Sequence, residues 1–121
     1  MPEQQHVLIV DDNEQARIFA AAVLGSAGYV VSQAGDAALA VEALKNRLFS
    51  AIVLDLKMPH NGVSLLDYIG ESFPDLLGRT IILTPPVNRP VWGALAKPFH
   101  PEPLLAAVKD CCDRSDGQPA A

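Results

Sequence analysis

Short apolar runs alternate along the chain with segments in which apolar residues recur at helical spacing. Most of the runs are rich in β-branched residues, which favour strands. In order, the runs are His6–Val10, Tyr29–Ala34, Ala51–Leu54, Thr80–Thr84 and a short Gly93–Ala96. Strands that alternate with helices predict βαβ units, and therefore an α/β fold with a doubly wound, five-stranded parallel sheet. Ala51–Leu54 is apolar on both faces, which is typical of a central strand.

The segments between these runs predict helices with one apolar face each. Gly28 and Pro74 predict the ends of the first and third helices, and Asp36 predicts a cap on the second. The last helix is expected from Pro101 to about Cys112. The expected inward faces comprise Ala16, Phe19, Ala20, Val23, Leu24 and Ala27; Ala40, Val41 and Leu44; Val63, Leu66 and Ile69; and Leu104, Leu105 and Val108.

Polar residues stand at the ends of four predicted strands. They are Asp11 and Asp12 after the first strand, Asp55 after the third, Thr84 at the end of the fourth and Lys97 after the fifth. In open parallel sheets, ligands bind outside the carboxyl ends of the strands. The sequence therefore predicts a site at this edge of the sheet.

Three carboxylates at one edge repel one another and predict a cation between them. Mg²⁺ prefers oxygen ligands and is usually held by only one or two carboxylates, so Asp12 and Asp55 could bind it directly and Asp11 through a water molecule. Lys97 would add a positive charge, and Thr84 a hydroxyl, around a phosphoryl group on Asp55. Asp55 is then the expected nucleophile of a phosphoryl transfer.

Each of these residues also has a simpler interpretation when it is taken alone. One aspartate at a strand end is more often a helix cap than a ligand, and a single lysine or threonine is more often an ordinary surface residue. Two consecutive aspartates and a third after a buried strand favour a site instead. The histidines share no ligand spacing and are expected to face solvent; they are His6, His60 and His100.

Composition narrows the class of protein further. The 121 residues suffice for one domain, and a net charge of −5 argues against a nucleic-acid partner. No apolar run is long enough to span a membrane and no signal peptide begins the chain, so a cytoplasmic protein without a membrane partner is expected. Adjacent Cys111 and Cys112 are expected to be reduced residues near a helix end. We expect one domain over residues 1–112 and a polar tail or linker over 113–121.

Four motifs together resemble those of the response regulator receiver domain of two-component signalling, in the CheY-like superfamily. They are Asp11-Asp12 after a β-run, Val53–Pro59 (VLDLKMP), Thr84 at a strand end and Lys97-Pro98-Phe99. Each motif alone is weakly specific, but the set is specific and covers residues 6 to about 112. The resemblance implies a receiver domain of flavodoxin-like architecture.

The resemblance also implies a function. Asp55 would accept a phosphoryl group from a histidine kinase or a phosphotransfer protein, and the domain would signal through protein contacts. Such a domain is not an enzyme that acts on a separate substrate, although autodephosphorylation of its own aspartate stays open.

Roles in the site follow from the resemblance residue by residue. It implies Asp12, Asp55 and the backbone carbonyl of Lys57 as Mg²⁺ ligands, with Asp11 holding a metal-bound water. The same likeness implies that two further side chains contact the phosphoryl group, namely Lys97 and Thr84.

Other classes fit the residues less well. A phosphatase of the haloacid dehalogenase type needs a second acid two residues after its nucleophile, where this chain has Lys57. A nucleotide-binding module needs a glycine-rich loop after the first strand, where this chain has the acidic segment 11–14. The remaining alternative is a degenerate receiver, which keeps the fold and binds proteins without being phosphorylated.

Three departures from the family's pattern keep that alternative open. Pro85 follows Thr84 where the family usually has a residue whose backbone N–H helps to hold the phosphoryl oxygens, and proline has no N–H. Ala94 stands where an aromatic residue usually accompanies the threonine in switching. The loop Met58–Gly62 is one residue shorter than the common form, which puts little at risk.

The largest departure from the family's pattern is in the connection between the fourth and fifth strands. Only twelve residues, 85–96, separate Thr84 from Lys97, and three of them are prolines. Because the fifth strand takes four of these residues, the usual crossover helix is expected to be missing or reduced to one turn. The uncovered side of the sheet would then bind a second copy or an output partner, with Trp92 as an anchor. The alternative is that Trp92 folds inward and fills the vacated space.

Pro85→Ala restores a backbone N–H beside Thr84. A charge-assisted hydrogen bond contributes about 1.5–3 kcal/mol, so the variant is expected to bind beryllofluoride, a phosphoryl mimic, about 10- to 100-fold more tightly in Mg²⁺. A titration of both proteins measures this difference. Unchanged or weaker binding by the variant would contradict the idea that proline deprives the phosphoryl group of a donor.

Overall fold

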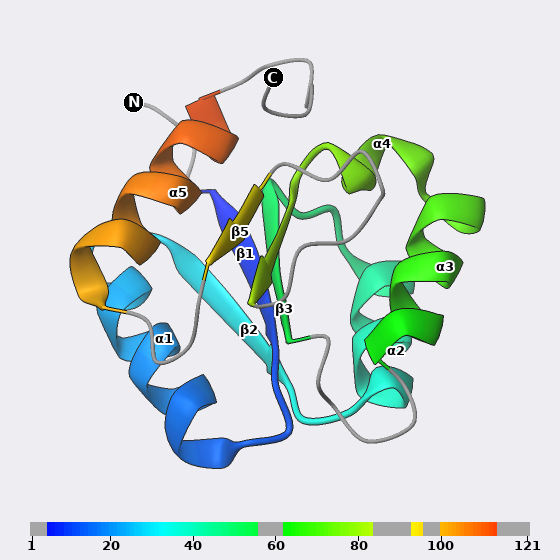
Figure 1. Ribbon diagram of the computed structural model, residues 1–121, viewed down its shortest axis with the longest axis horizontal. Coiled ribbons are helices and arrows are strands. Elements are labelled where there is room, and N and C mark those ends of the chain that lie inside the picture. Colours follow the sequence, from blue (N-terminus) through cyan, green and yellow to red (C-terminus); the bar gives the residue numbers. More distant parts are fainter. Residues whose placement is uncertain (1–4, 56–61, 84–92, 96–99, 114–121) are drawn as a thin grey trace.

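The computed structural model describes residues 5–55, 62–83, 93–95 and 100–113, which form a five-stranded sheet with helices on both faces (Figure 1). The strands are β1 (His6–Val10), β2 (Val30–Ala34), β3 (Ala51–Asp55), β4 (Thr80–Leu83) and β5 (Gly93–Leu95). Their order in the sheet is β2-β1-β3-β4-β5, and every neighbouring pair is parallel. The predicted α/β fold with a doubly wound parallel sheet is confirmed.

Two layers of helices enclose this sheet (Figure 1). One face is covered by α1 (Glu14–Ser26) and α5 (Pro101–Asp113). The other face is covered by α2 (Ala37–Asn46) and α3 (Gly62–Ser72), and the short α4 (Pro74–Leu77) follows α3. None of the helices in the described part of the chain is long and apolar enough to span a membrane.

Successive side chains of the central strands point to opposite faces of the sheet, and because they are apolar they build one core on each face. In β3, Ile52 and Leu54 join the core beneath α2 and α3. The residues between them, Ala51 and Val53, join the core beneath α1 and α5. All five residues of β3 are buried, as the sequence predicted for a central strand.

Two details of the helices differ from the sequence prediction. Phe19 was expected to face inward, but its side chain is 42% exposed, and Ala27 is exposed as well. The inward face of α1 is narrower than expected, with Ala20 and Leu24 buried on it. Phe19 lies about 100° around the helix from Ala20, which turns it toward solvent.

Pro74 does more than end a helix. The α3 helix ends at Ser72, and Pro74 begins α4. The predicted loss of a helix between β4 and β5 concerns residues 84–92, which lie outside the described residues.

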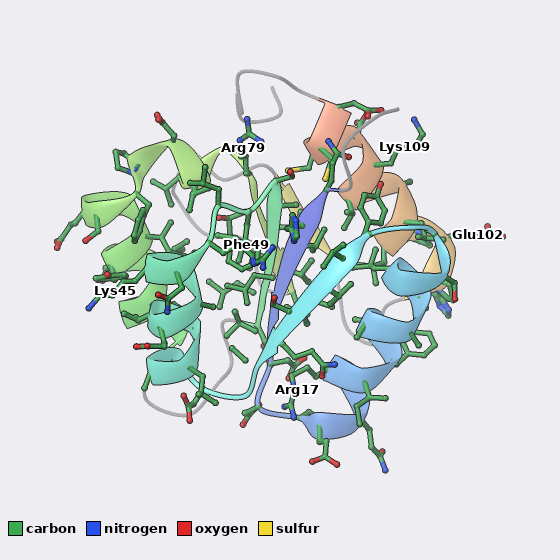
Figure 2. The ribbon with its side chains drawn as sticks, turned by 180° about the vertical axis from the view of Figure 1, so that it is seen from behind. Arg17, Lys45, Phe49, Arg79, Glu102 and Lys109 are labelled. Carbon is green, nitrogen blue, oxygen red and sulfur yellow. The ribbon has the colours of Figure 1, made fainter. Side chains whose placement is uncertain are left out.

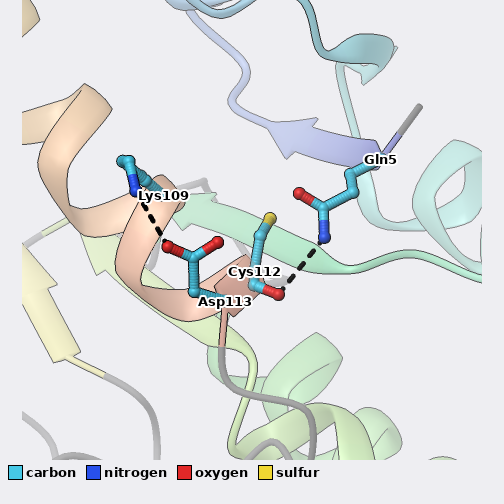
Figure 3. Close-up of polar contacts among 4 residues, drawn as sticks. All are labelled: Gln5, Lys109, Cys112 and Asp113. Carbon is cyan, nitrogen blue, oxygen red and sulfur yellow. Dashed lines mark hydrogen bonds and ion pairs between the residues drawn. The ribbon is translucent and has the colours of Figure 1, made fainter. Parts of the chain in front are cut away.

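Both cysteines are free thiols buried in the last turns of α5, as the sequence predicted. Burial, aided by the charge of Asp113, raises the pKa of Cys112 to about 11, so the thiol stays neutral at physiological pH. Figure 3 shows how this helix end is held: Gln5 Nε2 donates to the Cys112 carbonyl oxygen at 3.2 Å, and Lys109 pairs with Asp113 at 2.9 Å. These cysteines therefore act as small apolar residues of the core.

The C-terminus of α1 depends on a glycine. Gly28 has a φ of 99°, in the left-handed region. Its N–H donates to the Gly25 carbonyl oxygen at 3.0 Å, and the N–H of Tyr29 donates to that of Leu24 at 3.2 Å. This pair of hydrogen bonds is a Schellman motif, which turns the chain out of α1 and into β2.

Gly28→Ala is expected to lower the free energy of unfolding by about 1–2 kcal/mol, because a Cβ is disfavoured at this φ. Gly25→Ala is the matched control. A Cβ at Gly25 meets no heavy atom within 4 Å, so alanine is expected to raise the free energy of unfolding by about 0.5–1 kcal/mol. Urea unfolding measures both changes, and two changes of the same sign would contradict this account of the turn.

Candidate functional site

Three carboxylates meet at the carboxyl edge of the sheet. Asp11, Asp12 and Asp55 each offer one oxygen, and these oxygens all lie within 4.8 Å of one another. The side chains of Asp11 and Asp55 are only 1% and 3% exposed, whereas Asp12 is exposed. The structure thus brings together the three acidic residues that the sequence placed at this edge, as a cluster with one side open to solvent.

Strand pairing explains why these residues meet. In the register of β1 with β3, Val10 pairs with Leu54, so the next residues along each strand, Asp11 and Asp55, are neighbours. The backbone N–H of Asp11 also donates to the carbonyl oxygen of Ala34 at 3.1 Å, which continues the pairing with β2. Asp55 is the last residue of β3 and is held by the strand itself.

Helix capping near the site is done by other residues. The N-cap of α1 is Asn13, whose Oδ1 accepts from the N–H of Ala16 at 2.9 Å. Asp11 Oδ1 instead accepts from the N–H of Asn13 at 2.9 Å, which closes the turn between β1 and α1. Asp36 caps α2 as predicted, through Leu39 N–H at 2.8 Å. The simpler interpretation of Asp11 as the cap of α1 is therefore wrong.

The donor set of this cluster suits a hard divalent cation. Carboxylate oxygens are the ligands that Mg²⁺ prefers, and a cation offsets the repulsion between three negative groups, two of them buried. Receiver domains generally bind Mg²⁺ at an acidic pocket, and this acidic cluster fits that requirement.

One residue of the site was not predicted from the sequence. Arg17, in α1, donates from Nη1 to the backbone carbonyl oxygen of Asp11 at 2.9 Å. It also donates from Nε to Gln33 Oε1 at 3.3 Å. The only signal in the sequence that could have indicated this contact was the position of Arg17, one helical turn after the cap of α1. That signal is weak, because a charged residue at such a position usually faces solvent.

Three other predicted site residues lie outside the described residues: Lys57, Thr84 and Lys97. Their roles stay predictions. Within the described strands, Leu83 pairs with Asp55, and Leu95 pairs with Leu83.

Comparison with known proteins identifies the family. A model of the response regulator receiver domain matches residues 7–109. The chain therefore belongs to the response regulator receiver domain family, whose members are signalling modules and not classical enzymes.

Individual relatives agree with this assignment. The chain is 29% identical over 113 residues to the response regulator receiver protein CpdR of Brucella abortus, a match that spans 87% of this chain and 94% of that protein. It is 30% identical over 118 residues to an NtrX-like response regulator of Rickettsia bellii, across 88% of this chain and 24% of that protein. The chain thus spans about a quarter of the length of this second relative.

Solved structures share the fold. A CheY-like response regulator receiver domain protein from Methanospirillum hungatei superposes with a TM-score of 0.81 at 24% identity, over 92% of this chain and 95% of that one. The chemotaxis response regulator CheY4 of Vibrio cholerae superposes with a TM-score of 0.78 at 26% identity, over 90% of this chain and 99% of that one.

Asp12→Asn removes one of the three clustered charges with little change in shape. Without divalent cations, the variant is expected to raise the free energy of unfolding by about 1–3 kcal/mol, because repulsion in the cluster falls. Urea unfolding in a chelator measures the change.

Glu71→Gln is the control, because it removes an exposed negative charge near the end of α3, away from this edge of the sheet. Its effect is expected to stay within about 0.5 kcal/mol. Equal effects of the two substitutions would show that net charge, and not the cluster, destabilises the protein.

Proposed function

We propose that this chain accepts a phosphoryl group on Asp55 from a histidine kinase or a phosphotransfer protein, with Mg²⁺, and signals through protein contacts. The observation that carries the proposal is the acidic cluster, in which a buried Asp55 lies beside Asp11 and Asp12 at the carboxyl edge of the sheet. Membership of the receiver family supports the same assignment.

The chemistry assigns a separate task to each carboxylate. Asp12 and Asp55 would hold the metal directly, Asp11 would hold it through a water molecule, and the backbone carbonyl of Lys57 would complete the protein ligands. Bound Mg²⁺ supplies positive charge that offsets the carboxylates and the incoming phosphoryl oxygens.

Asp55 performs the transfer itself. One of its carboxylate oxygens forms a bond to phosphorus as the bond between phosphorus and the donor histidine nitrogen breaks, and that nitrogen keeps the electron pair. Burial of Asp55 limits the access of water to this oxygen. Lys97 and Thr84 are assigned to the phosphoryl oxygens, where an ammonium and a hydroxyl group stabilise negative charge.

The proposal also covers the setting of the domain. We assign the receiver to residues 1–112, with 113–121 as a tail or linker, and we place this chain in the cytoplasm. The β4–β5 side remains the proposed surface for a second copy or an output partner.

A small phosphodonor such as acetyl phosphate tests the proposal directly. With Mg²⁺ present, it is expected to label the wild-type protein once, on Asp55, and a chelator is expected to prevent labelling. Asp55→Asn should abolish the label, and Asp12→Asn should lower the affinity for Mg²⁺ about tenfold or more, because a direct ligand loses its charge. Intact mass spectrometry and calorimetry measure these quantities.

Asp36→Asn is the matched control, because it removes a carboxylate that follows β2 and leaves an equally good helix cap. This variant is expected to be labelled like the wild type. Labelling that survives Asp55→Asn would contradict the assignment of the phosphoacceptor. A wild-type protein that neither binds Mg²⁺ nor becomes labelled would instead be a degenerate receiver.

A further inference from the structure

Arg17 joins the ends of two strands to the first helix. Its guanidinium donates to the Asp11 carbonyl oxygen at 2.9 Å and to Gln33 Oε1 at 3.3 Å. Figure 2 shows Arg17 where β1 and β2 end and α1 begins. The side chain is half-buried, and its planar group bonds to two partners at once, which a lysine could not do with the same geometry.

A glycine leaves room for this arrangement. A Cβ built on Gly35, the residue after β2, would lie 3.2 Å from Arg17 Nη1. That distance is shorter than ordinary van der Waals contact, so a side chain at this position would press on the nitrogen that bonds to Asp11. The guanidinium of Arg17 therefore occupies the space that a side chain at position 35 would need.

The contact with Asp11 acts on the metal cluster through the backbone. The Asp11 carbonyl belongs to the peptide unit that joins Asp11 to Asp12, two of the three clustered acids. Asp11 makes two further hydrogen bonds: its backbone N–H donates to the carbonyl oxygen of Ala34, and its side-chain Oδ1 accepts from the backbone N–H of Asn13. Arg17 adds the hydrogen bond that fixes the orientation of this peptide unit.

We infer that Arg17 is a positioning residue for the metal site: it holds the Asp11–Asp12 peptide so that both carboxylates face Asp55. The inference rests on the proposed function, because it concerns Mg²⁺ binding at that cluster. Arg17 contacts neither the metal nor the phosphoryl group in this role. It acts on the ligands through the main chain, as groups that orient metal ligands commonly do.

The charge of Arg17 and its position have opposite effects on metal binding. A positive group near the cluster repels Mg²⁺, so loss of the charge alone would tighten binding. Loss of the hydrogen bond lets the peptide unit move, which weakens binding. Solvent screens the charge of a half-buried guanidinium, whereas a small displacement of a ligand acts directly on the site. Position therefore outweighs charge here.

Arg17→Met is the main test, with Arg47→Met as its matched control. Arg47 carries the same charge, and its Nη1 lies 2.6 Å from Nδ1 of His6, at the opposite edge of the sheet. In calorimetric Mg²⁺ titrations, Arg17→Met is expected to bind about tenfold more weakly than the wild type, and Arg47→Met within about twofold of it. Wild-type or tighter binding by Arg17→Met would overturn the inference.

Gly35→Ala separates position from charge, because the added Cβ would shift the guanidinium by a few tenths of an ångström while every charged residue is kept. It is expected to weaken Mg²⁺ binding in the same direction as Arg17→Met, by a smaller factor, and unchanged binding in both variants would overturn the inference. If Arg17→Met does not fold, Mg²⁺ binding by Gly35→Ala tests the inference in its place.

Amide exchange without metal gives a second readout that does not depend on the proposed function. The N–H of Asn13, which donates to Asp11 Oδ1, is expected to exchange faster in Arg17→Met than in Arg47→Met. Failure of the wild type to bind Mg²⁺ would contradict the proposed function itself. The exchange rates would then still decide whether Arg17 holds this turn, and equal rates would show that it does not.

Discussion

Parallel pairing of β1 with β3 determines where three negative charges lie. Because Val10 is the register partner of Leu54, the next residues, Asp11 and Asp55, are brought side by side at the sheet edge. Both strands are buried between two apolar cores, so they cannot move apart to relieve the repulsion. Repulsion makes such a cluster unfavourable when it is empty, and the proposed cation would offset that repulsion.

The turn between β1 and α1 is held from three sides, which makes the site rigid before any ligand arrives. Asp11 is bonded to β2 through Ala34, to its own turn through Asn13 and to α1 through Arg17. Preorganised carboxylates cost little reorganisation when a cation binds, and the cation would then offset the negative charge of an incoming phosphoryl group. The folded core therefore contributes to the proposed chemistry by fixing the geometry of the carboxylates.

Much of this arrangement follows from the sequence. Strands with β-branched runs, the central place of Ala51–Leu54 and the gathering of the acidic residues were all predicted, because parallel strands end at the same edge. Asp36 and Gly28 also behave as their residue types predict. These features depend on local chemistry and on one rule of topology.

Other features depend on tertiary contacts that the sequence does not show. The first helix has apolar residues on several sides, so periodicity alone could not tell that Ala20 faces inward and Phe19 faces solvent. Pro74 can end one helix or begin another, and packing decides between these outcomes. The contact of Arg17 with a main-chain carbonyl has no signature in the residue type, because the acceptor is a backbone atom that every residue carries.

Titration with Mg²⁺ followed by beryllofluoride, monitored by amide chemical shifts, tests the central claim most directly, because beryllofluoride on an aspartate stands in for a phosphoryl group. The account predicts that Mg²⁺ alone shifts the amides of Asp11–Asn13 and Asp55. It also predicts that beryllofluoride adds further shifts around Asp55 only when Mg²⁺ is present. Absence of shifts at these residues, or beryllofluoride binding that needs no metal, would contradict the account.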